Sequence, residues 1–257
     1  MLHLIDGQNY VRRMLEHDPS GRVPRKILIT MQTIATEPVV WCWEGKGAWQ
    51  TRRAIYPPYK GRRDPQPDST WQTINLIRDM LQHTHAMQVS APGFEADDLI
   101  AFYTRSHADK MQVHIHSNDR DFNQLRDQEN VTGDFEEIAN ASTSLVRTYK
   151  TCVGDHSDNV SGIKGFGEKT WVMLRDIGAL HALRHMLEAL PTTHPSHTSV
   201  FTQLPVRCQG WINEHLEELF QMWLVVGFFD VANVHKDFTI GQPDYDKADL
   251  VLREFLQ

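Results

Sequence analysis

Short apolar runs alternate with segments of helical periodicity through the first half of the chain. The runs at residues 2–5, 39–43 and 113–117 have the length and composition of buried strands. Apolar residues recur at helical spacing in residues 25–35 and 71–81, and a further helix is predicted to begin at Glu95 and to reach Tyr103. Strands that alternate with helices predict an α/β fold with a mostly parallel sheet.

The second half of the chain has a different pattern. From about residue 149 onward the strand signals fade and helical periodicity dominates. We therefore predict an α/β domain over residues 1–150 and a helical domain over residues 151–257. Residues 57–70 are rich in Pro, Arg, Lys and Asp and are predicted to be exposed and irregular, and residues 192–199 are predicted to form a loop.

Composition places the chain among ordinary soluble globular proteins, with 257 residues, 40% of them hydrophobic and 23% charged. No apolar run approaches the roughly 20 residues that a membrane span needs, and no signal peptide is expected at the N-terminus. Three widely spaced cysteines indicate a reducing cytoplasm, without a disulfide framework or a cysteine zinc site. His181 and His185 lack the glutamate of a zinc-protease helix, so this pair indicates a surface helix.

Acidic residues lie at or just beyond the ends of the three predicted strands. They are Asp6, Glu44 and Asp119. The carboxyl ends of parallel strands meet at one edge of a sheet, so these carboxylates are expected to approach one another. Their repulsion would be relieved by hard divalent cations such as Mg²⁺, which prefer oxygen ligands. A turn or a helix cap is the alternative explanation for any one of them.

Three further acidic groups follow along the chain, and each has helix or turn capping as its alternative. They are Glu95 with Asp97 and Asp98, Asp121 beside Asp119, and Asp155 with Asp158. With Asp6 and Glu44 they make nine candidate metal ligands. The net charge of −7 is unusual for a nucleic-acid-binding protein, but removing nine negative charges leaves +2 for the rest of the chain.

A glycine-rich segment follows at residues 162–170. It superficially resembles a phosphate-binding P-loop, but Glu168 separates Gly167 from Lys169 and breaks that motif. We interpret it as a hairpin between two short helices, whose glycines let the backbone approach a nucleic-acid phosphate. Lys164 and Lys169 add positive charge to it.

Taken together and in this order, these motifs resemble the 5′ nuclease (flap endonuclease) superfamily, in particular bacteriophage 5′–3′ exonucleases and the 5′-nuclease domain of bacterial DNA polymerase I. The resemblance spans residues 1 to about 175, and no motif is found in residues 176–257. It implies a PIN-like, mostly parallel sheet with a helical arch, placed here at about residues 57–93. It also implies a helical C-terminal part with a helix–three-turn–helix (helix-hairpin-helix) module at residues 155–172.

The resemblance also implies roles for individual residues. Two Mg²⁺ ions, replaceable by Mn²⁺, would hydrolyse a phosphodiester bond, and a K⁺ ion could bind at the hairpin module. Asp6, Glu44, Asp97, Asp98 and Asp119 would hold the first metal, and Asp121, Asp155 and Asp158 the second, with Glu95 orienting a metal-bound water. Lys60 and Arg63 would contact the scissile phosphate, and Tyr59 would stack on a terminal base. The other residues implied in DNA binding are Arg62, Lys164, Gly165, Gly167, Lys169 and Thr170.

The sequence also departs from the family pattern. Glu44 stands where the family usually has Asp, and its longer side chain is expected to loosen or move the metal. The family's Phe-Arg after that acid is matched only loosely by residues 49–52, and the short stretch from Lys60 to Glu95 predicts a small arch.

The function expected is that of a 5′–3′ exonuclease or flap endonuclease acting on DNA or RNA–DNA hybrid, including RNA primers, near free 5′ ends, flaps or nicks. Two alternatives stay open, namely a non-catalytic relative that binds branched DNA and a PIN-like ribonuclease. We expect a monomer without membrane contact, in the cytoplasm or, for a viral protein, the host cytoplasm. With no polymerase domain following, it would act alone or with a separate DNA polymerase.

Overall fold

The computed structural model describes residues 1–138 and 141–255, and it divides into two compact units. The sheet unit comprises Met1–Ala48, Asp64–Glu136 and Phe229–Gln257. The helical unit comprises Trp49–Arg63 and Glu137–Phe228.

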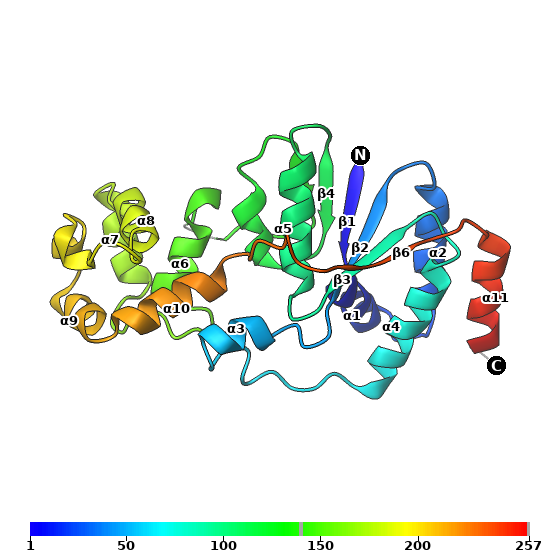
Figure 1. The fold of residues 1–257 in the computed structure, drawn as a ribbon, viewed down its shortest axis with the longest axis horizontal. Helices are drawn as coiled ribbons and strands as arrows, with labels where there is room; N and C mark the ends of the chain where they lie inside the picture. The colour runs from blue at the N-terminus through cyan, green and yellow to red at the C-terminus, as the bar shows by residue number, and fades with distance from the viewer. Residues whose placement is uncertain (139–140, 256–257) are drawn as a thin grey trace. The chain divides into compact units, whose positions relative to one another are not determined.

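A six-stranded sheet forms the centre of the sheet unit, with the strand order β5-β4-β1-β2-β3-β6. The strands are β1 (Leu2–Asp6), β2 (Val39–Glu44), β3 (Met87–Ala91), β4 (Val113–His116), β5 (Val131–Gly133) and β6 (Asp237–Ile240). The first five strands are parallel, and β6 pairs antiparallel with β3. The predicted α/β fold with a mostly parallel sheet is therefore confirmed (Figure 1).

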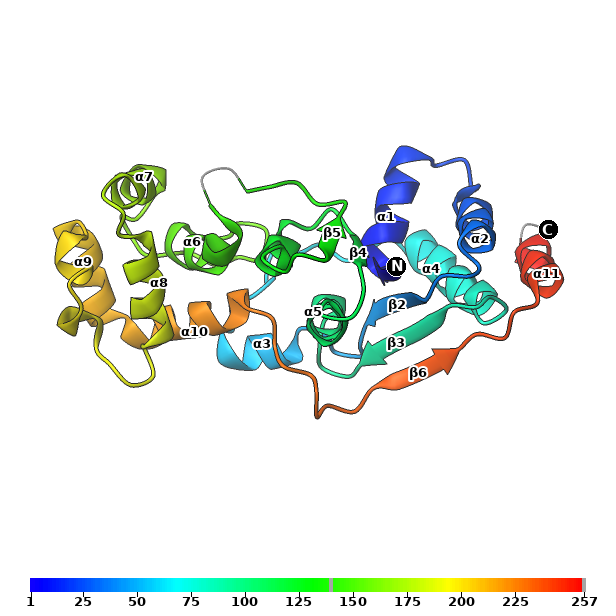
Figure 2. The ribbon, with the colours of Figure 1, turned by 90° about the horizontal axis from the view of Figure 1, so that it is seen from above.

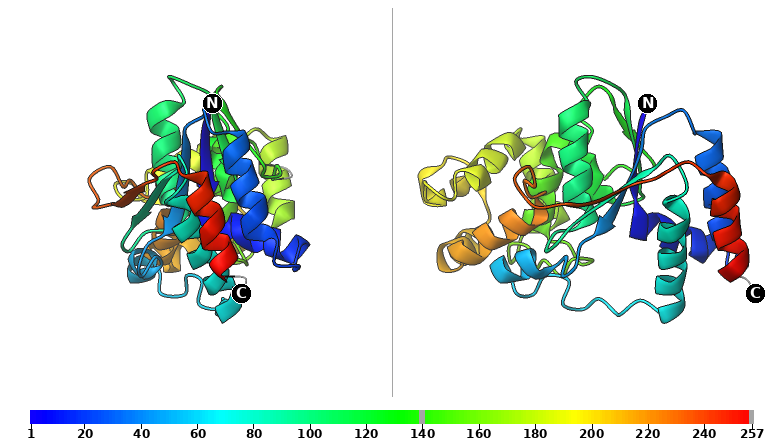
Figure 3. Two further views of the ribbon diagram at one scale, coloured as in Figure 1. Left: turned by 90° about the vertical axis from the view of Figure 1, so that its right-hand side faces the viewer. Right: turned by 45° about the vertical axis from the view of Figure 1, so that its right-hand side comes forward.

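Helices cover both faces of this sheet. They are α1 (Gly7–His17), α2 (Val23–Thr33), α4 (Asp68–Leu81), α5 (Ala96–His107), the short 3₁₀ helix η1 (Arg120–Leu125) and α11 (Tyr245–Phe255). Trp41 and Trp43 alternate with Val40 and Cys42 along β2, and the two tryptophans pack in one core with apolar residues of α1, α2, α4 and α11. Helix α5 packs against strands β1 to β4 on the other face, as Figure 2 shows. Helix α11 lies beside α2 and α4 (Figure 3).

The helical unit has a core of its own. Its helices are α3 (Gln50–Ile55), α6 (Val146–Val153), α7 (Glu168–Asp176), α8 (Leu180–Glu188), α9 (Val206–Glu214), α10 (Leu216–Val226) and the 3₁₀ turns η2 (Thr143–Leu145), η3 (Pro195–His197) and η4 (Phe201–Gln203). Trp171 of α7 and Leu219 and Met222 of α10 are fully buried in that core. The buried guanidinium of Arg52 in α3 donates to the carbonyls of Val225 and Gly227 at the end of α10, 3.1 Å away in each case.

The division of the chain differs from the boundary predicted at residue 150. Residues after Phe229 return to the sheet unit, where β6 pairs with β3 and Ala248 and Leu252 of α11 fill the core under α2 and α4. The sequence did not predict β6, because the segment has only four residues, and its apolar residues Phe238 and Ile240 are exposed.

The expected bounds of the arch are too wide. Residues 68–81 form α4, whose Ile77, Met80 and Leu81 are fully buried against the sheet. Residues 87–91 form β3, an interior strand of that sheet. Between α3 and α4 there remain only residues 56–67, which form turns and extended chain. In residues 1–138 and 141–255, no helix is long and apolar enough to cross a membrane.

Candidate functional site

Three neighbouring strands bring the predicted acids to one edge of the sheet. Asp6 is the last residue of β1, Glu44 is the last residue of β2, and Asp119 follows the end of β4. Because β4, β1 and β2 are consecutive in the sheet, their carboxyl ends lie side by side. The hydroxyl of Ser117 joins two of these ends, since it donates to Oδ2 of Asp6 over 3.0 Å.

The electrostatics of Asp6 show how crowded this edge is. Its side chain is buried, with 6% of the residue exposed. The pKa of Asp6 is raised to about 7 by its burial and by the nearby charges of Asp119 and Glu44, while hydrogen bonds from Asn9 and Ser117 oppose the shift. Oxygen donors that repel one another at a buried position fit a divalent cation, which would relieve both the repulsion and the cost of burial.

The N-terminus of α5 contributes acids with two different environments. Glu95 and Asp98 form a reciprocal capping box, and Asp98 is fully buried. The carboxylate of Asp98 accepts hydrogen bonds from the amides of Glu95, at 3.2 Å, and Phe229, at 2.8 Å. Capping, the alternative explanation for this group, therefore applies to Glu95 and Asp98.

Asp97 is the partly exposed acid of the same helix. Burial raises the pKa of the Cys42 thiol well above its ordinary value, and the charges of Asp6 and Asp97 raise it further. Both carboxylates thus act on one thiol of β2, which places Asp97 near the acids at the strand ends.

Asp119 and Asp121 lie in a turn that is itself hydrogen bonded. The carboxylate of Asp119 accepts from the amide of Asp121 over 2.9 Å and caps η1, and its own amide donates to Oγ of Ser117. The predicted Asx turn is therefore present, and it orients the Asp119 side chain beside Asp6.

In the helical unit, Asp155 and Asp158 each have a lysine partner. Nζ of Lys150 lies 2.7 Å from Oδ2 of Asp155, and Nζ of Lys60 lies 3.7 Å from Oδ1 of Asp158. Burial alone would raise the pKa of Asp155, but the charge of Lys150 and the hydrogen bonds to its carboxylate outweigh burial and lower it. Each carboxylate therefore has a cation beside it within the helical unit.

The basic motif at residues 59–63 is less exposed than predicted. Tyr59 is 3% exposed, and its hydroxyl donates to Asp158 over 3.1 Å. The expectation that Tyr59 stacks on a terminal base is wrong in this structure, because the ring is part of the core of the helical unit. Lys60 is 6% exposed, whereas Arg62 and Arg63 are exposed.

The glycine-rich segment joins α6 and α7, as expected of a hairpin between two short helices. Gly162 and Gly165 have φ values of 70° and 90°, a region that favours glycine. Gly167 precedes the first residue of α7, and Lys164 and Lys169 are exposed. Thr170 is buried, which argues against direct contact between its side chain and DNA.

Sequence reasoning missed two residues that organise these acids, Ser117 and Lys150. Ser117 precedes Asp119 by two residues, so its position at the end of a predicted strand was the available signal. Lys150 lies on α6, five residues before Asp155, and nothing in the sequence distinguishes it from a surface lysine.

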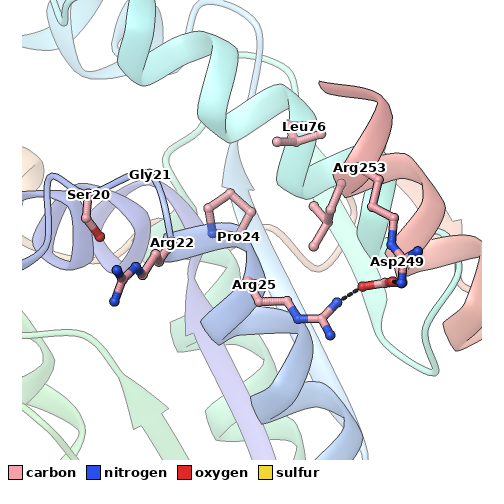
Figure 4. Close-up of a pocket in the computed structure, with 9 residues that line it drawn as sticks. Ser20, Gly21, Arg22, Pro24, Arg25, Leu76, Asp249 and Arg253 are labelled. Atoms are coloured by element: carbon pink, nitrogen blue, oxygen red, sulfur yellow. Dashed lines mark ion pairs between the residues drawn. The ribbon is translucent and has the colours of Figure 1, made fainter. Parts of the chain in front are cut away.

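Two cavities lie away from the acids at the strand ends. One, of about 560 Å³, borders the turn at residues 154–161 in the helical unit and is lined in part by Asp155, Arg62 and His156. The other, of about 380 Å³, lies between α2, α4 and α11 in the sheet unit (Figure 4). Its Arg25 and Arg253 both pair with Asp249, so it offers no cluster of acids for a metal.

Comparison with known proteins identifies the family. Residues 1–150 match the family described as "5'-3' exonuclease, N-terminal resolvase-like domain". The chain is 33% identical over 147 residues to a 5′-3′ exonuclease of Mycoplasma pneumoniae, covering 50% of each. It is 28% identical over 222 residues to a 5′-3′ exonuclease of Aquifex aeolicus, covering 79% of this chain and 70% of that protein. DNA polymerase I of Deinococcus radiodurans is 36% identical over 141 residues, which are 50% of this chain and 15% of the polymerase.

The matches to the first two relatives span about half of those proteins, 50% and 46% of their lengths. Among solved structures, a T5 5′-exonuclease with bound zinc superposes with a TM-score of 0.66 at 19% identity, covering 99% of this chain and 98% of that one. A complex of the bacteriophage T5 flap endonuclease with DNA and metal ions gives 0.65 at 17% identity, covering 99% and 97%. These structures confirm the fold, and the family match confirms the predicted resemblance. The chain therefore belongs to the 5′-3′ exonuclease family, through the N-terminal resolvase-like domain that defines it.

Proposed function

We propose that this protein is a divalent-metal-dependent 5′ nuclease that hydrolyses phosphodiester bonds near the 5′ ends of DNA or RNA–DNA hybrid. The observation that carries the proposal is the convergence of Asp6, Glu44 and Asp119 at the ends of three adjacent strands, with Asp6 buried and its pKa raised to about 7. A protein that only bound DNA would gain nothing from a repulsive acidic cluster facing phosphates. The names of the curated relatives, 5′-3′ exonucleases among them, support the same activity.

Asp6, Glu44, Asp97 and Asp119 are the residues that we propose for the first metal, which we take to be Mg²⁺ or Mn²⁺. Glu95 and Asp98 support the site from the capping box and hold the start of α5 in place. Asp121, Asp155 and Asp158 remain predicted ligands of the second metal. The bound ions would supply an activated water and would neutralise charge on the attacking and leaving oxygens.

The chain's own residues have separate tasks in this proposal. Ser117 and Asn9 hold the Asp6 carboxylate in place through the hydrogen bonds that they donate to it. Arg62 and Arg63 are exposed and can contact the phosphates of the substrate strand. Lys164 and Lys169, with Gly165 and Gly167, would hold the duplex backbone, and the same hairpin is the place for a K⁺ ion.

The partners follow from this activity. The substrate would be a flap, a nick or a 5′ end, and RNA primers are included because cleavage of the backbone does not require a particular sugar. The match to part of a DNA polymerase I supports action together with a separate polymerase. Three buried cysteines outside any disulfide suit a reducing compartment such as the cytoplasm.

The test is single-turnover cleavage of 5′-labelled flap, nicked and blunt duplexes, with the products sized. We expect cleavage in Mg²⁺ or Mn²⁺, none in excess EDTA, and at least about 10²-fold slower cleavage by Asp119→Asn. Full activity in EDTA would overturn the metal mechanism. Tight binding of branched DNA without cleavage by the wild type would identify a non-catalytic relative, and cleavage of single-stranded RNA alone would identify a PIN-like ribonuclease.

A further inference from the structure

Three histidines lie together on one face of the sheet, apart from the acids at the strand ends. His114 and His116 alternate along β4 and therefore point to the same side. His3 of the neighbouring strand β1 is in register with His114 and lies on that side too, with its ring 5.2 Å from the ring of His116. Asp134 follows the end of β5, the strand next to β4.

The distances within this cluster are close to those of a metal site. Nε2 of His114 lies 3.1 Å from Oδ1 of Asp134, and Nδ1 of His116 lies 3.6 Å from Oδ2 of Asp134. The three ligand atoms all lie within 4.8 Å of one another. In a tetrahedral zinc site with bonds of about 2.0–2.2 Å, neighbouring ligand atoms are about 3.3–3.6 Å apart. A small contraction or expansion of the cluster would therefore admit an ion.

The ring nitrogens of His114 and His116 that do not face Asp134 have hydrogen-bond partners of their own. Nδ1 of His114 lies 2.8 Å from Oγ1 of Thr132, which leaves Nε2 toward Asp134. Nε2 of His116 lies 2.9 Å from Nδ1 of His3, which leaves Nδ1 toward Asp134. Metal-binding histidines almost always donate their second N–H to a carboxylate, a backbone carbonyl or water, which fixes the tautomer. The hydroxyl of Thr132 and the ring nitrogen of His3 can accept in the same way.

A second layer completes the arrangement around His116. Nε2 of His3 lies 3.2 Å from Glu37, so a chain of contacts runs from Glu37 through His3 to His116. In the tautomer that donates from Nε2 to Glu37, Nδ1 of His3 can accept from His116. Glu37 is therefore the carboxylate that orients the metal-binding residue His116, and it does so through the ring of His3.

We propose that His114, His116 and Asp134 bind one transition-metal ion of the Zn²⁺ class, with Thr132 and His3 orienting the two imidazoles. Imidazole nitrogens favour zinc over magnesium, so this site is chemically distinct from the all-carboxylate site at the strand ends. The side chains of His114, His116 and Asp134 are 25%, 21% and 36% exposed, which leaves room for an ion to enter and for a water as fourth ligand. The ion would link β5 to β4 at the edge of the sheet.

Among the described contacts, Arg13 is the one cation beside the Asp134 carboxylate that would compete with a metal ion. Its guanidinium lies 3.4 Å from Oδ2 of Asp134, whereas Oδ1 faces His114. The carboxylate therefore keeps its oxygens on the side of the two imidazoles.

The experiment is a titration of the intact protein with Zn²⁺ against a chromophoric chelator, in excess Mg²⁺ to occupy the carboxylate site. We expect one Zn²⁺ per chain in the wild type and in His181→Gln, a matched control in which an exposed histidine of α8 is replaced. In His114→Gln and His116→Gln the affinity for Zn²⁺ should fall by more than about 10–100-fold, which is the range for losing only a group that orients a metal ligand. Asp119→Asn should keep the bound ion.

The melting temperature and the Co²⁺ spectrum test the same site independently. Zn²⁺ should raise the Tm of the wild type but not of His114→Gln, and Co²⁺ in its place should give the visible bands of a four-coordinate nitrogen and oxygen site. Circular dichroism of each variant without metal checks the fold. The proposal is overturned if the wild type binds no Zn²⁺ in Mg²⁺, if His114→Gln binds it as tightly as the wild type, or if Asp119→Asn alone removes it.

Discussion

Lys60 and Asp158, far apart in the sequence, form a buried pair within the helical unit. Nζ of Lys60 lies 3.7 Å from Oδ1 of Asp158, and the amide of Lys60 donates to the carbonyl of Asp158 over 2.9 Å. Lys60 also has a φ of 48°, uncommon for a residue with a side chain. The backbone of the basic motif is therefore held in a specific conformation against the turn that contains Asp158.

We predict that this pair contributes to stability as a unit. Lys60→Met keeps the apolar stem but removes the charge, and Asp158→Asn removes its partner. Because Lys60 is 6% exposed and the Asp158 side chain 16% exposed, we expect a coupling energy of about 1–3 kcal/mol. Urea unfolding of the wild type, both single variants and the double variant measures it. Additive losses would contradict the pair, and Arg62→Met, at an exposed neighbour, serves as the control that changes little.

Asp119→Asn should lower the cleavage rate and raise the stability of the metal-free protein. Removing this negative charge relieves its repulsion with buried Asp6, and Asn can still cap η1. In metal-free buffer we expect Tm to rise by about 2–4 °C, which corresponds to about 1 kcal/mol for a chain of this size. Differential scanning calorimetry in EDTA checks this prediction. A lower Tm than that of the wild type would show that Asp119 stabilises the fold through contacts other than its charge.

Gly165 and Gly167 should respond differently to a β-branched side chain. Gly165 has a φ of 90°, and a Cβ built on it would lie 2.9 Å from Cδ of Arg207, so Gly165→Val should lower the stability of the native protein. Gly167 has a φ of −130°, and no protein atom lies within 4 Å of a Cβ built on it.

Gly167→Val therefore tests the approach of a ligand without disturbing the fold. We expect unchanged unfolding and a raised Kd for duplex DNA of any sequence, measured by fluorescence anisotropy at several salt concentrations. Lys169→Gln is the comparison, because loss of one phosphate contact should reduce the slope of log Kd against the logarithm of the salt concentration by about one. An unchanged Kd for Gly167→Val would count against close contact between this backbone and a phosphate.

The three thiols should be unreactive in the native protein. Cys42, Cys152 and Cys208 are buried, and burial raises the pKa of each thiol. A thiolate is the reactive form, so a disulfide reagent at pH 8 should titrate none of them until denaturant is added. Rapid modification of one native thiol would show that its surroundings open in solution.

The sequence predicted the parts of the fold that have strong periodicity. Residues 2–5, 39–43 and 113–116 are strands, and α2 and α5 lie where helices were expected. It did not predict β3, whose Met87, Gln88 and Ser90 give no strand signal, and β3 is a strand because Val40 to Glu44 of β2 pair with it. Long-range pairing of this kind cannot be read from local pattern.

The candidate site was predictable to a similar extent. The approach of Asp6, Glu44 and Asp119 followed from the rule that parallel strands end at one edge. Burial of Tyr59 and Lys60 could not be predicted, because the Pro- and Arg-rich segment around them has the composition of an exposed loop. Their burial depends on the turn around Asp158, which lies far along the chain.

The antiparallel strand β6 has a consequence for synthesis of the protein on the ribosome. Met87 of β3 pairs with Ile240 of β6, so the edge of β3 stays unpaired while residues 92–236 are translated, among them Glu137–Phe228 of the helical unit. At about 5–20 residues per second this takes roughly 8–30 s. During that interval β3 is the open edge of a nascent sheet, and an unpaired edge can pair with another chain. Slowed translation between residues 91 and 237 would lengthen this exposure and lower the yield of folded protein.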